Sequence, residues 1–438
     1  MKHDRYRDTL DYLYQQLPMY QRIGPAALKP GLGNIRELCW SLGLPQWRFR
    51  SLHIAGTNGK GSVSSMLAAV LHAAGFRTGL YTSPHLADFT ERIRIGGAAI
   101  QQEAVVAFVD RCRSALERIQ PSFFETTVAM AFDYFARSEV DVAVIETGLG
   151  GRLDSTNLIR PELSIITNIS WDHMDLLGDT LALIAGEKAG IIKRFTPVVI
   201  GQRHPETEEV FLRKAAELEA PVRFAEDCFR VERLGGSWRG QQFRVEPLAD
   251  PEPAGTYGLS LAGLYQAENL RTVLAAVAQL REDGWSIPDE ALRDGLLHVR
   301  AYAGLRGRME PLGESPLILC DTGHNEAGIA AVLEQLREIP CRQQHLVWGM
   351  ASDKDHARIL RMLPQAARYY FVRPDVPRGL DAGVLRDKAA GAGLHGDAHG
   401  SVADGIAAAQ AAAGPEDLIF IGGSTFVVAE ALPLFPEA

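Results

Sequence analysis

The sequence predicts an α/β fold: a phosphate-loop domain with a parallel sheet and a small antiparallel patch, followed by a smaller Rossmann-like α/β domain. Short β-branched runs each end in a turn containing Gly or Asn, and a longer stretch with helical spacing of apolar residues follows each one. The runs lack polar alternation, which is typical of parallel strands buried on both faces. The alternation breaks once, near residues 300–307, and then restarts. These observations indicate two α/β units in one chain.

In the first unit, five runs are expected to be strands: Leu52–Ala55, Thr78–Tyr81, Val140–Ile145, Leu163–Thr167 and Pro197–Ile200. From Val222 to Leu261, aromatic residues stand among polar residues and turn signals, which predicts the small antiparallel patch. Helical spacing returns in Tyr265–Leu280 and again in Ile287–Leu297. We therefore expect residues 1–299 to form one domain.

Residues 300–307 are expected to be a hinge, and residues 308–438 a second domain that is long enough for its own hydrophobic core. Its predicted strands are Leu317–Cys320, His345–Trp348, Tyr369–Val372 and Leu418–Ile421. The Ala-rich stretch Gly405–Ala413 is predicted to be a helix between the last two strands.

The composition narrows the class of protein. The chain has 438 residues, of which 46% are hydrophobic and 23% charged, as in ordinary globular proteins. A net charge of −9 argues against the basic surface that nucleic-acid binding needs. Five scattered cysteines without CxxC spacing indicate neither a disulfide framework nor a zinc site. The N-terminus is charged and no run of about 18 apolar residues occurs, so we expect a cytoplasmic protein without a membrane segment.

A phosphate-binding loop is predicted directly after the first strand. The segment Gly56-Thr57-Asn58-Gly59-Lys60-Gly61-Ser62 leads into a stretch with helical spacing. Its glycines allow backbone N–H groups to turn toward a phosphate, and the helix N-terminus and Lys60 supply positive charge. Ile54 and Gly61 depart from the G-x-x-x-x-G-K-[ST] pattern, so a plain glycine-rich turn with a solvated lysine is the alternative.

Polar residues at the ends of the following strands predict a magnesium site. Ser83, Glu146 and His173 come just after the second, third and fourth strands, whose carboxyl ends meet at one edge of a parallel sheet. Glu146 is the strongest candidate, because an unpaired carboxylate at a buried strand end is unfavourable without a cation. His173 is less typical, since Mg²⁺ prefers oxygen ligands, and a packed or capping histidine is its alternative.

Lys188 lies in a predicted helix, Leu181–Lys193, with Asp179 or Thr180 as the N-cap. It is surrounded by apolar residues and follows Glu187. A surface lysine that covers apolar neighbours with its stem is an equally good interpretation of the pattern.

The phosphate loop, the stretch Glu146-Thr147-Gly148-Leu149-Gly150-Gly151-Arg152-Leu153-Asp154-Ser155-Thr156-Asn157 and the motif Asp321-Thr322-Gly323-His324-Asn325 together resemble the folylpolyglutamate synthase/dihydrofolate synthase family, which belongs to the Mur ligase superfamily. The resemblance runs from Arg22-Ile23-Gly24 and Lys29-Pro30-Gly31-Leu32 to Gly422-Gly423-Ser424. The chain departs from the family at Leu305-Arg306, where many members have Trp-Pro, at Thr322-Gly323, where many have Gly-Ala, and at Ser122, where threonine is common.

The resemblance implies roles for individual residues. Contacts to ATP fall on Thr57, Asn58, Gly59, Lys60, Gly61, Ser62, Asn269, Arg308, Asp321 and His324, with Arg308 at the phosphates and Asp321 at the ribose. Magnesium ligands fall on Ser83, Glu146 and His173, and Lys188 matches a carbamylated lysine that helps to hold a second magnesium. The pterin of dihydropteroate falls on Ser122, Phe124, Asp154 and Ser155. Lys60, Lys188, His173 and Arg308 are the expected catalytic residues.

The activity implied is ATP-dependent ligation of L-glutamate to dihydropteroate and to reduced folates through an acyl phosphate, with ATP, two Mg²⁺ ions and a monomeric chain that closes about the hinge. Synthesis of polyglutamate tails alone is the nearest alternative. A peptidoglycan Mur ligase is disfavoured, because the 55 residues before Gly56 are too few for the additional nucleotide-sugar domain. A P-loop ATPase would give no role to Arg308, Asp321 and His324. A catalytically inactive binding protein with this fold is disfavoured, because the set of polar site residues is complete.

Overall fold

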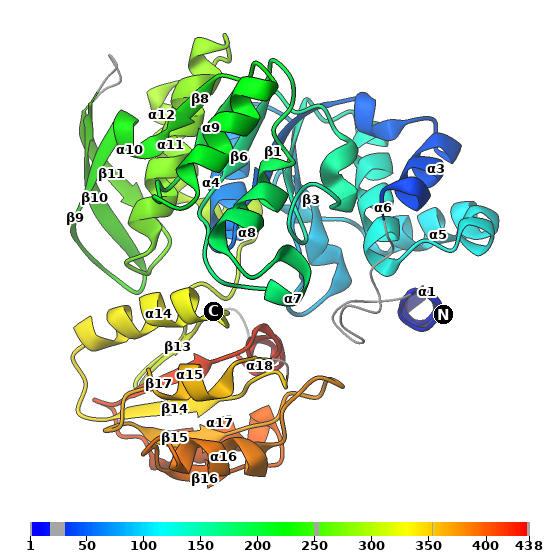
Figure 1. Cartoon of the computed structure of the whole chain (residues 1–438). Coiled ribbons are helices and arrows are strands. Elements are labelled where there is room, and N and C mark those ends of the chain that lie inside the picture. The colour runs from blue at the N-terminus through cyan, green and yellow to red at the C-terminus, as the bar shows by residue number, and fades with distance from the viewer. Residues whose placement is uncertain (1, 18–30, 249–253, 353, 436–438) are drawn as a thin grey trace.

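The computed structural model describes residues 2–17, 31–248, 254–352 and 354–435, which form two α/β units (Figure 1). The motif residues Arg22, Ile23, Gly24, Lys29 and Pro30 lie outside the described residues. The first unit contains a mixed, mainly parallel sheet with the strand order β4-β3-β2-β5-β1-β6-β7-β8. Its strands are β1 (Arg50–Ala55), β2 (Thr78–Tyr81), β3 (Ile93–Ile95), β4 (Ala98–Ala99), β5 (Val142–Glu146), β6 (Leu163–Ile166), β7 (Val198–Ile200) and β8 (Val222–Phe224).

One face of this sheet is covered by α4 (Lys60–Ala73), α11 (Gln266–Glu282), α12 (Asp289–Leu297) and α13 (Val299–Ala303). Because successive residues of a strand point to opposite faces, Leu52 and Ile54 of β1 join this core. The three-stranded antiparallel sheet packs here too, and comprises β9 (Phe229–Ser237), β10 (Gly240–Pro247) and β11 (Gly255–Leu259).

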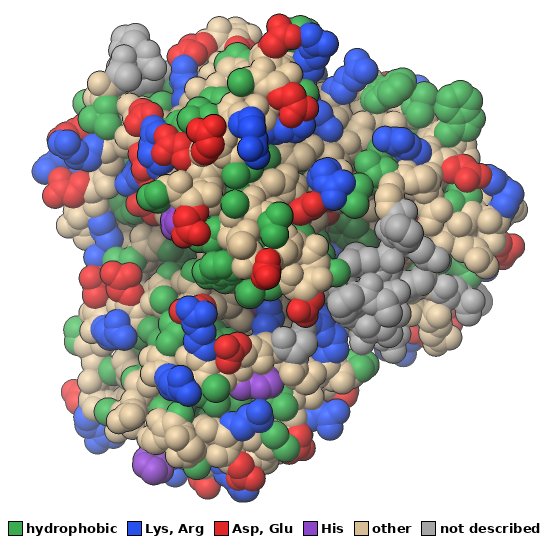
Figure 2. Space-filling view, in the orientation of Figure 1, with side chains coloured by type: hydrophobic (Ala, Val, Ile, Leu, Met, Phe, Trp, Pro, Cys, Tyr) green, Lys and Arg blue, Asp and Glu red, His purple; other side chains and the backbone are tan. Residues whose placement is uncertain are grey.

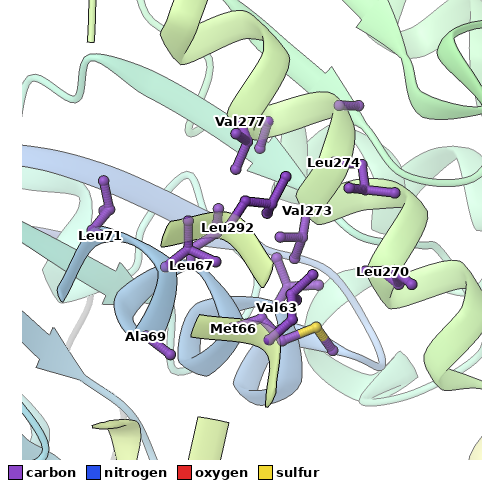
Figure 3. Packing of buried hydrophobic residues seen from close by; sticks show 14 of the residues in the cluster. Val63, Met66, Leu67, Ala69, Leu71, Leu270, Val273, Leu274, Val277 and Leu292 are labelled. Atoms are coloured by element: carbon purple, nitrogen blue, oxygen red, sulfur yellow. The ribbon is translucent and has the colours of Figure 1, made fainter. Parts of the chain in front are cut away.

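Helix α4 is buried on all sides, which explains its uniformly apolar and small-residue sequence (Figure 3). Val63, Met66 and Leu67 pack against side chains of α11 and α12, and each fully buried leucine contributes about 1.5–3 kcal/mol. A Cβ on Gly295 of α12 would lie 2.5 Å from Val70 Cα, so the two helices approach closely. The phosphate loop therefore stands on a rigid support.

One part of the other face is covered by helices from the N-terminal third of the chain: α1 (Lys2–Gln16), α3 (Gly33–Ser41), α5 (Gln102–Ile119) and α6 (Phe123–Arg137). Farther along the sheet it is covered by α8 (Leu181–Ala189) and α9 (Glu208–Glu217). The short elements of this unit are η2 (Pro45–Trp47), η3 (Phe89–Arg92), η4 (Ser155–Leu158), α7 (Met174–Leu177) and α10 (Ala225–Cys228).

The second unit is a sheet with the order β12-β13-β17-β14-β15-β16, in which only the β12–β13 pair is antiparallel among the described residues. Its strands are β12 (Glu310–Glu314), β13 (Leu317–Cys320), β14 (Gln344–Trp348), β15 (Arg368–Phe371), β16 (Gly396–Ala398) and β17 (Leu418–Gly422). Its helices are α14 (Glu326–Glu338), α15 (His356–Leu360), α16 (Ala382–Ala390), α17 (Val402–Ala412), α18 (Thr425–Ala431) and η5 (Leu432–Leu434). Separate apolar clusters cover its two faces, as in a Rossmann-like fold.

Two details of the sequence interpretation are wrong. The predicted antiparallel patch included Val222–Phe224, but this segment is β8 and pairs in parallel with β7 (Val198↔Val222). The expected hinge at 300–307 starts inside α13, whose Val299 and Ala303 are buried in the core of the first unit. Of residues 300–307, only 304–307 lack regular structure, while the boundaries of the functional domains stay a prediction.

Within the described part of the chain, no helix combines the length and the apolar character that a membrane span requires. On the face shown in Figure 2, acidic and basic side chains are intermixed.

Candidate active site

A cavity of about 1010 Å³ lies between the two units, at the carboxyl ends of the central strands of the first sheet. Every residue selected from the sequence lines it: Thr57, Asn58, Gly59, Lys60, Gly61, Ser62, Ser83, Ser122, Phe124, Glu146, Asp154, Ser155, His173, Lys188, Asn269, Arg308, Asp321 and His324. The fold thus brings together residues that are far apart in the chain.

The phosphate loop connects β1 to α4 and has the conformation that its glycines require. Gly59 caps α4 with a φ of +84°, and a Cβ there would lie 2.3 Å from Asn269 Oδ1. Only glycine avoids both the strain and the collision. Lys60 Nζ donates to the carbonyl oxygens of Gly56 (3.1 Å) and Thr57 (3.2 Å), so its ammonium lies over the loop.

Two charged side chains approach the start of α4 from opposite units. A Cβ built on Gly61 would be 3.5 Å from Arg308 Nη2 and 3.8 Å from Glu146 Oε1. The Arg308 guanidinium is held by the Gly307 carbonyl (3.1 Å) and the Thr322 hydroxyl. Positive charge from the second unit therefore stands beside the loop that carries Lys60.

Glu146 is buried at the end of β5, and its Oε2 accepts a hydrogen bond from the Ser83 backbone nitrogen at 3.0 Å. Burial raises the pKa of Glu146, while the positive charges of Lys60 and Arg308 oppose this rise. A carboxylate with so little access to water is a good ligand for a cation.

His173 precedes α7 with a φ of +50° and lies beside Asp172, the Nε2–Oδ2 distance being 3.8 Å. Burial lowers the pKa of His173 to about 4, so the imidazole is neutral at pH 7, the form that binds metals. No cluster of three or more His, Cys, Asp or Glu suited to a metal occurs in the described ranges. A hydroxyl, one carboxylate and one neutral imidazole nevertheless fit a divalent cation that also takes water and phosphate oxygens.

Lys188 is buried, with 3% of its surface exposed, and its Nζ donates to the Gly56 carbonyl at 2.9 Å. This excludes the interpretation as a surface lysine. Burial, and next the charge of Lys60, lower the pKa of Lys188 to about 7. Thr180 is the N-cap of its helix, because its side chain accepts from Leu183 N.

The residues expected around the nucleotide form hydrogen-bonded groups of their own. Asp321 accepts from the Tyr265 hydroxyl (2.6 Å), Met309 N (2.8 Å) and Gly323 N (2.7 Å). Asn269 donates to Gln266 Oε1 at 2.8 Å, and His324 Nδ1 lies 3.1 Å from the Thr322 carbonyl. These contacts fix the side chains before a ligand arrives.

The other end of the cavity is partly aromatic. The Phe124 ring lies against Gly148, where a Cβ would be 2.4 Å from its Cζ. Ser122 caps α6, since its Oγ accepts from Glu125 N at 3.2 Å. Buried Asp154 accepts from Leu149 N (2.8 Å), Thr156 N (3.0 Å) and Thr156 Oγ1 (2.5 Å). Burial raises the pKa of Asp154, and these donors oppose that rise.

Sequence reasoning missed several charged residues that line the cavity: Glu91, Arg92, Arg94, Asp172, Lys354 and Arg378. Asp172 is the most connected, because Lys354 Nζ (2.9 Å) and Asn325 Nδ2 (3.0 Å) both donate to it from the second unit. Burial would raise the pKa of Asp172, but the hydrogen bond and charge of His324 and the charge of Lys354 hold it well below its usual value. The adjacent His173 was the one local signal for this residue.

Comparison with known proteins gives two family matches. Residues 54–278 match the Mur ligase middle domain, and residues 307–425 match the Mur ligase glutamate ligase domain. The two matches end and begin on either side of α12 and α13.

Among curated proteins, the chain is 35% identical to the dihydrofolate synthase/folylpolyglutamate synthase of Bacillus subtilis, over 87% of this chain and 88% of that protein. It is 36% identical to a probable bifunctional folylpolyglutamate synthase/dihydropteroate synthase of Haloferax volcanii, over 99% of this chain. The chain spans about half the length of the Haloferax protein, 51% of which is covered.

Solved structures agree along the whole chain. Folylpolyglutamate synthase of Mycobacterium tuberculosis in complex with ADP has a TM-score of 0.88 at 33% identity, with 100% of both chains covered. Escherichia coli FolC in complex with DHPP and ADP has a TM-score of 0.83 at 30% identity, covering 98% of this chain and 97% of that one. A bifunctional folylpolyglutamate synthase/dihydrofolate synthase with Mn, AMPPNP and L-glutamate bound has a TM-score of 0.81 at 29% identity, covering 98% and 97%.

Proposed function

This chain belongs to the folylpolyglutamate synthase/dihydrofolate synthase family of Mur ligases, and from that membership we propose that it ligates L-glutamate to dihydropteroate and to reduced folates at the expense of ATP. The observation that carries the proposal is the convergence of Lys60, Arg308 and Glu146 at the start of α4. A site with two cations and one buried carboxylate supports the transfer of a phosphoryl group.

The first step is attack of the substrate carboxylate on the γ-phosphorus of ATP, which gives an acyl phosphate and ADP. Lys60 and the backbone N–H groups of residues 59–61 hold the phosphates, and Arg308 neutralises charge that develops on the transferred group. No nucleophile from the protein is needed, so the chain acts by positioning its two substrates.

Ser83, Glu146 and His173 are the residues that would hold a first magnesium ion, and Lys188 as a carbamate would help to hold a second. A divalent cation bound here supplies charge stabilisation to the phosphate oxygens. The low pKa of Lys188, about 7, supports its carbamylation, because a neutral amine is the form that reacts with CO₂.

In the second step the amino group of L-glutamate displaces phosphate from the acyl carbon and forms the amide. Closure of the second unit over the first excludes water, which would otherwise hydrolyse the acyl phosphate. Because both sides of the cavity come from one chain, we propose that the monomer is the active form. Location in the cytoplasm stays a prediction.

We assign the aromatic end of the cavity to the pterin ring of the substrate. Phe124 offers a flat apolar face for a pterin ring, and Asp154 is an acceptor for its amino and ring N–H donors. Ser122 and Ser155 add hydroxyl groups beside them. Reduced folates carry a pterin ring as well, so the reaction with dihydropteroate is what distinguishes the bifunctional enzyme from one that only extends existing tails.

The test is ADP release by the purified protein with ATP, magnesium, L-glutamate and either dihydropteroate or a reduced folate. We expect release only when both the pterin substrate and glutamate are present, with dihydrofolate as the product from dihydropteroate. ADP release without glutamate would indicate an ATPase. A chain that accepts reduced folate but leaves dihydropteroate unchanged would be an extension-only synthase.

A further inference from the structure

A histidine lies in the middle of β1, a strand whose buried part is otherwise apolar except for Ser51. His53 is completely buried and pairs in register with Ile145 on one side and Ser164 on the other. Its neighbours Leu52 and Ile54 point to the opposite face, toward α4. The imidazole therefore occupies the face of the sheet on which η4 lies.

The ring of His53 is connected to Asp154 through one hydroxyl group. His53 Nε2 lies 2.9 Å from Thr156 Oγ1, and Thr156 Oγ1 donates to Asp154 Oδ1 at 2.5 Å. A hydroxyl has a single hydrogen, so with Asp154 ionised, Thr156 donates to Asp154 and accepts from His53. This assigns the imidazole proton to Nε2 in the neutral ring.

The other ring nitrogen supports the same tautomer. His53 Nδ1 is buried and has no hydrogen-bond partner in the described structure, whereas a protonated Nδ1 would leave a buried donor unsatisfied. Burial, and next the charge of Lys193, lower the pKa of His53 to about 3, so the ring is neutral at pH 7.

The direction of these two hydrogen bonds determines whether Asp154 acts as a donor or as an acceptor. As long as Thr156 is compelled to donate, Asp154 Oδ1 receives its hydrogen and the carboxyl group stays an acceptor. Without the donor at Nε2, the Thr156 hydroxyl is free to turn around, and a protonated Asp154 can donate to it instead. A carboxylic acid with its hydrogen so placed recognises a ring that carries N–H donors less well.

We propose that His53 is a positioning residue for substrate recognition, which acts through Thr156 to hold Asp154 as an acceptor of hydrogen bonds from the pterin ring. This rests on the proposed function, since it takes Asp154 as the pterin-binding carboxylate. A histidine that merely fills space in the core would not need its Nε2 donor, and this difference can be measured.

The experiment compares His53→Gln, His53→Asn and His53→Leu in the full chain. A glutamine side chain can place its amide nitrogen near the position of Nε2, whereas the asparagine amide corresponds to Nδ1 and falls short. We expect His53→Leu and His53→Asn to raise the KM for dihydropteroate about tenfold, with the KM for ATP changed by less than about twofold, and His53→Gln to restore most of the affinity. Direct titration of dihydropteroate against each folded variant should give the same order.

Thr156→Val provides a second route that leaves β1 untouched and serves if His53→Leu does not fold. It should raise the KM for dihydropteroate as His53→Leu does, and the double variant should be no worse than Thr156→Val alone, because both remove one relay. Equal KM values in folded His53→Leu, His53→Gln and wild-type protein would overturn the relay. Asp154→Ala distinguishes a failure of the pterin assignment from a failure of the relay. If its KM for dihydropteroate is unchanged, both the pterin assignment and this proposal are overturned. If Asp154→Ala raises that KM but Thr156→Val does not, only the relay is overturned.

Discussion

The side-chain amides of Asn58 and Asn325 face each other across the boundary between the two units. Asn325 Nδ2 donates to Asn58 Oδ1 at 3.0 Å, and Asn58 Nδ2 donates to Asn325 Oδ1 at 3.2 Å. Asn58 belongs to the phosphate loop, while Asn325 is the N-cap of α14 and also donates to Asp172. The phosphate loop is thus in direct contact with the second unit, and closure of the cavity and the shape of the loop are linked.

Replacing Asn325 by serine tests this link. Serine is an equally good N-cap, so α14 should still begin at this position, but the short serine side chain cannot span to Asn58 and Asp172. We expect the KM for ATP to rise about fivefold or more, measured by steady-state ADP release. Asp381→Ser, which likewise places serine at the N-cap of a helix, α16, should leave KM unchanged. Equal KM values in the two variants would contradict the link.

Lys60→Ala should reduce turnover at least about a hundredfold and leave the fold intact, because it removes a charge that serves phosphate. Lys60 Nζ donates to two loop carbonyls and lies over the loop, so little packing is lost. Circular dichroism and the ADP assay measure the two effects. Lys214→Ala, on an exposed face of α9, is the control and should behave as the wild type. Near-normal turnover of Lys60→Ala would refute the assignment of the loop.

Glu146→Gln keeps an oxygen that accepts from Ser83 N but removes the negative charge. The magnesium concentration for half-maximal activity should rise about tenfold, measured by titration with the ion. Because burial raises the pKa of Glu146, the ionised carboxylate destabilises the folded chain at pH values above that pKa. The amide removes this cost, so the melting temperature without metal should stay equal or increase. A lower melting temperature with unchanged magnesium dependence would indicate a structural role.

Lys188 should carry a carbamate when bicarbonate is present. Its pKa of about 7 lies below the ordinary lysine value, so the neutral amine predominates above pH 7 and is lost as the pH falls through 7. The carbamate signal in ¹³C-bicarbonate NMR should therefore weaken on acidification. Unmodified lysine in a high-resolution crystal grown with bicarbonate would count against the modification.

The same assignment predicts that Lys188→Ala loses turnover and regains part of it with short-chain carboxylates, which replace the missing anion. Acetate and formate can be added to the ADP assay at constant ionic strength, with chloride as the control. Chloride that rescues as well as acetate would point to general screening of charge in the cavity.

The elements that the sequence predicted best are those set by local pattern. The strand Thr78–Tyr81 has the predicted bounds, and β1 leads into the phosphate loop as expected, because apolar period and glycine turns act over a few residues. The segment Val222–Phe224 was misplaced, because three residues carry too little periodicity to choose between parallel and antiparallel partners. Residues 300–303 read as a linker, although packing against α4 makes them the last helix of the first unit.

The sequence by itself determined which chemical groups are present and, through the spacing of glycines and apolar runs, the strands whose ends carry them. Only the tertiary structure decided their partners and charge states. Lys188 reads equally well as a surface residue until burial against Gly56 lowers its pKa, and nothing near His53 in the sequence points to Asp154. Such contacts join residues more than 100 positions apart, as with Asn58 and Asn325. They depend on how sheets and helices pack, and burial then sets the free energy of each charge, which no local pattern records.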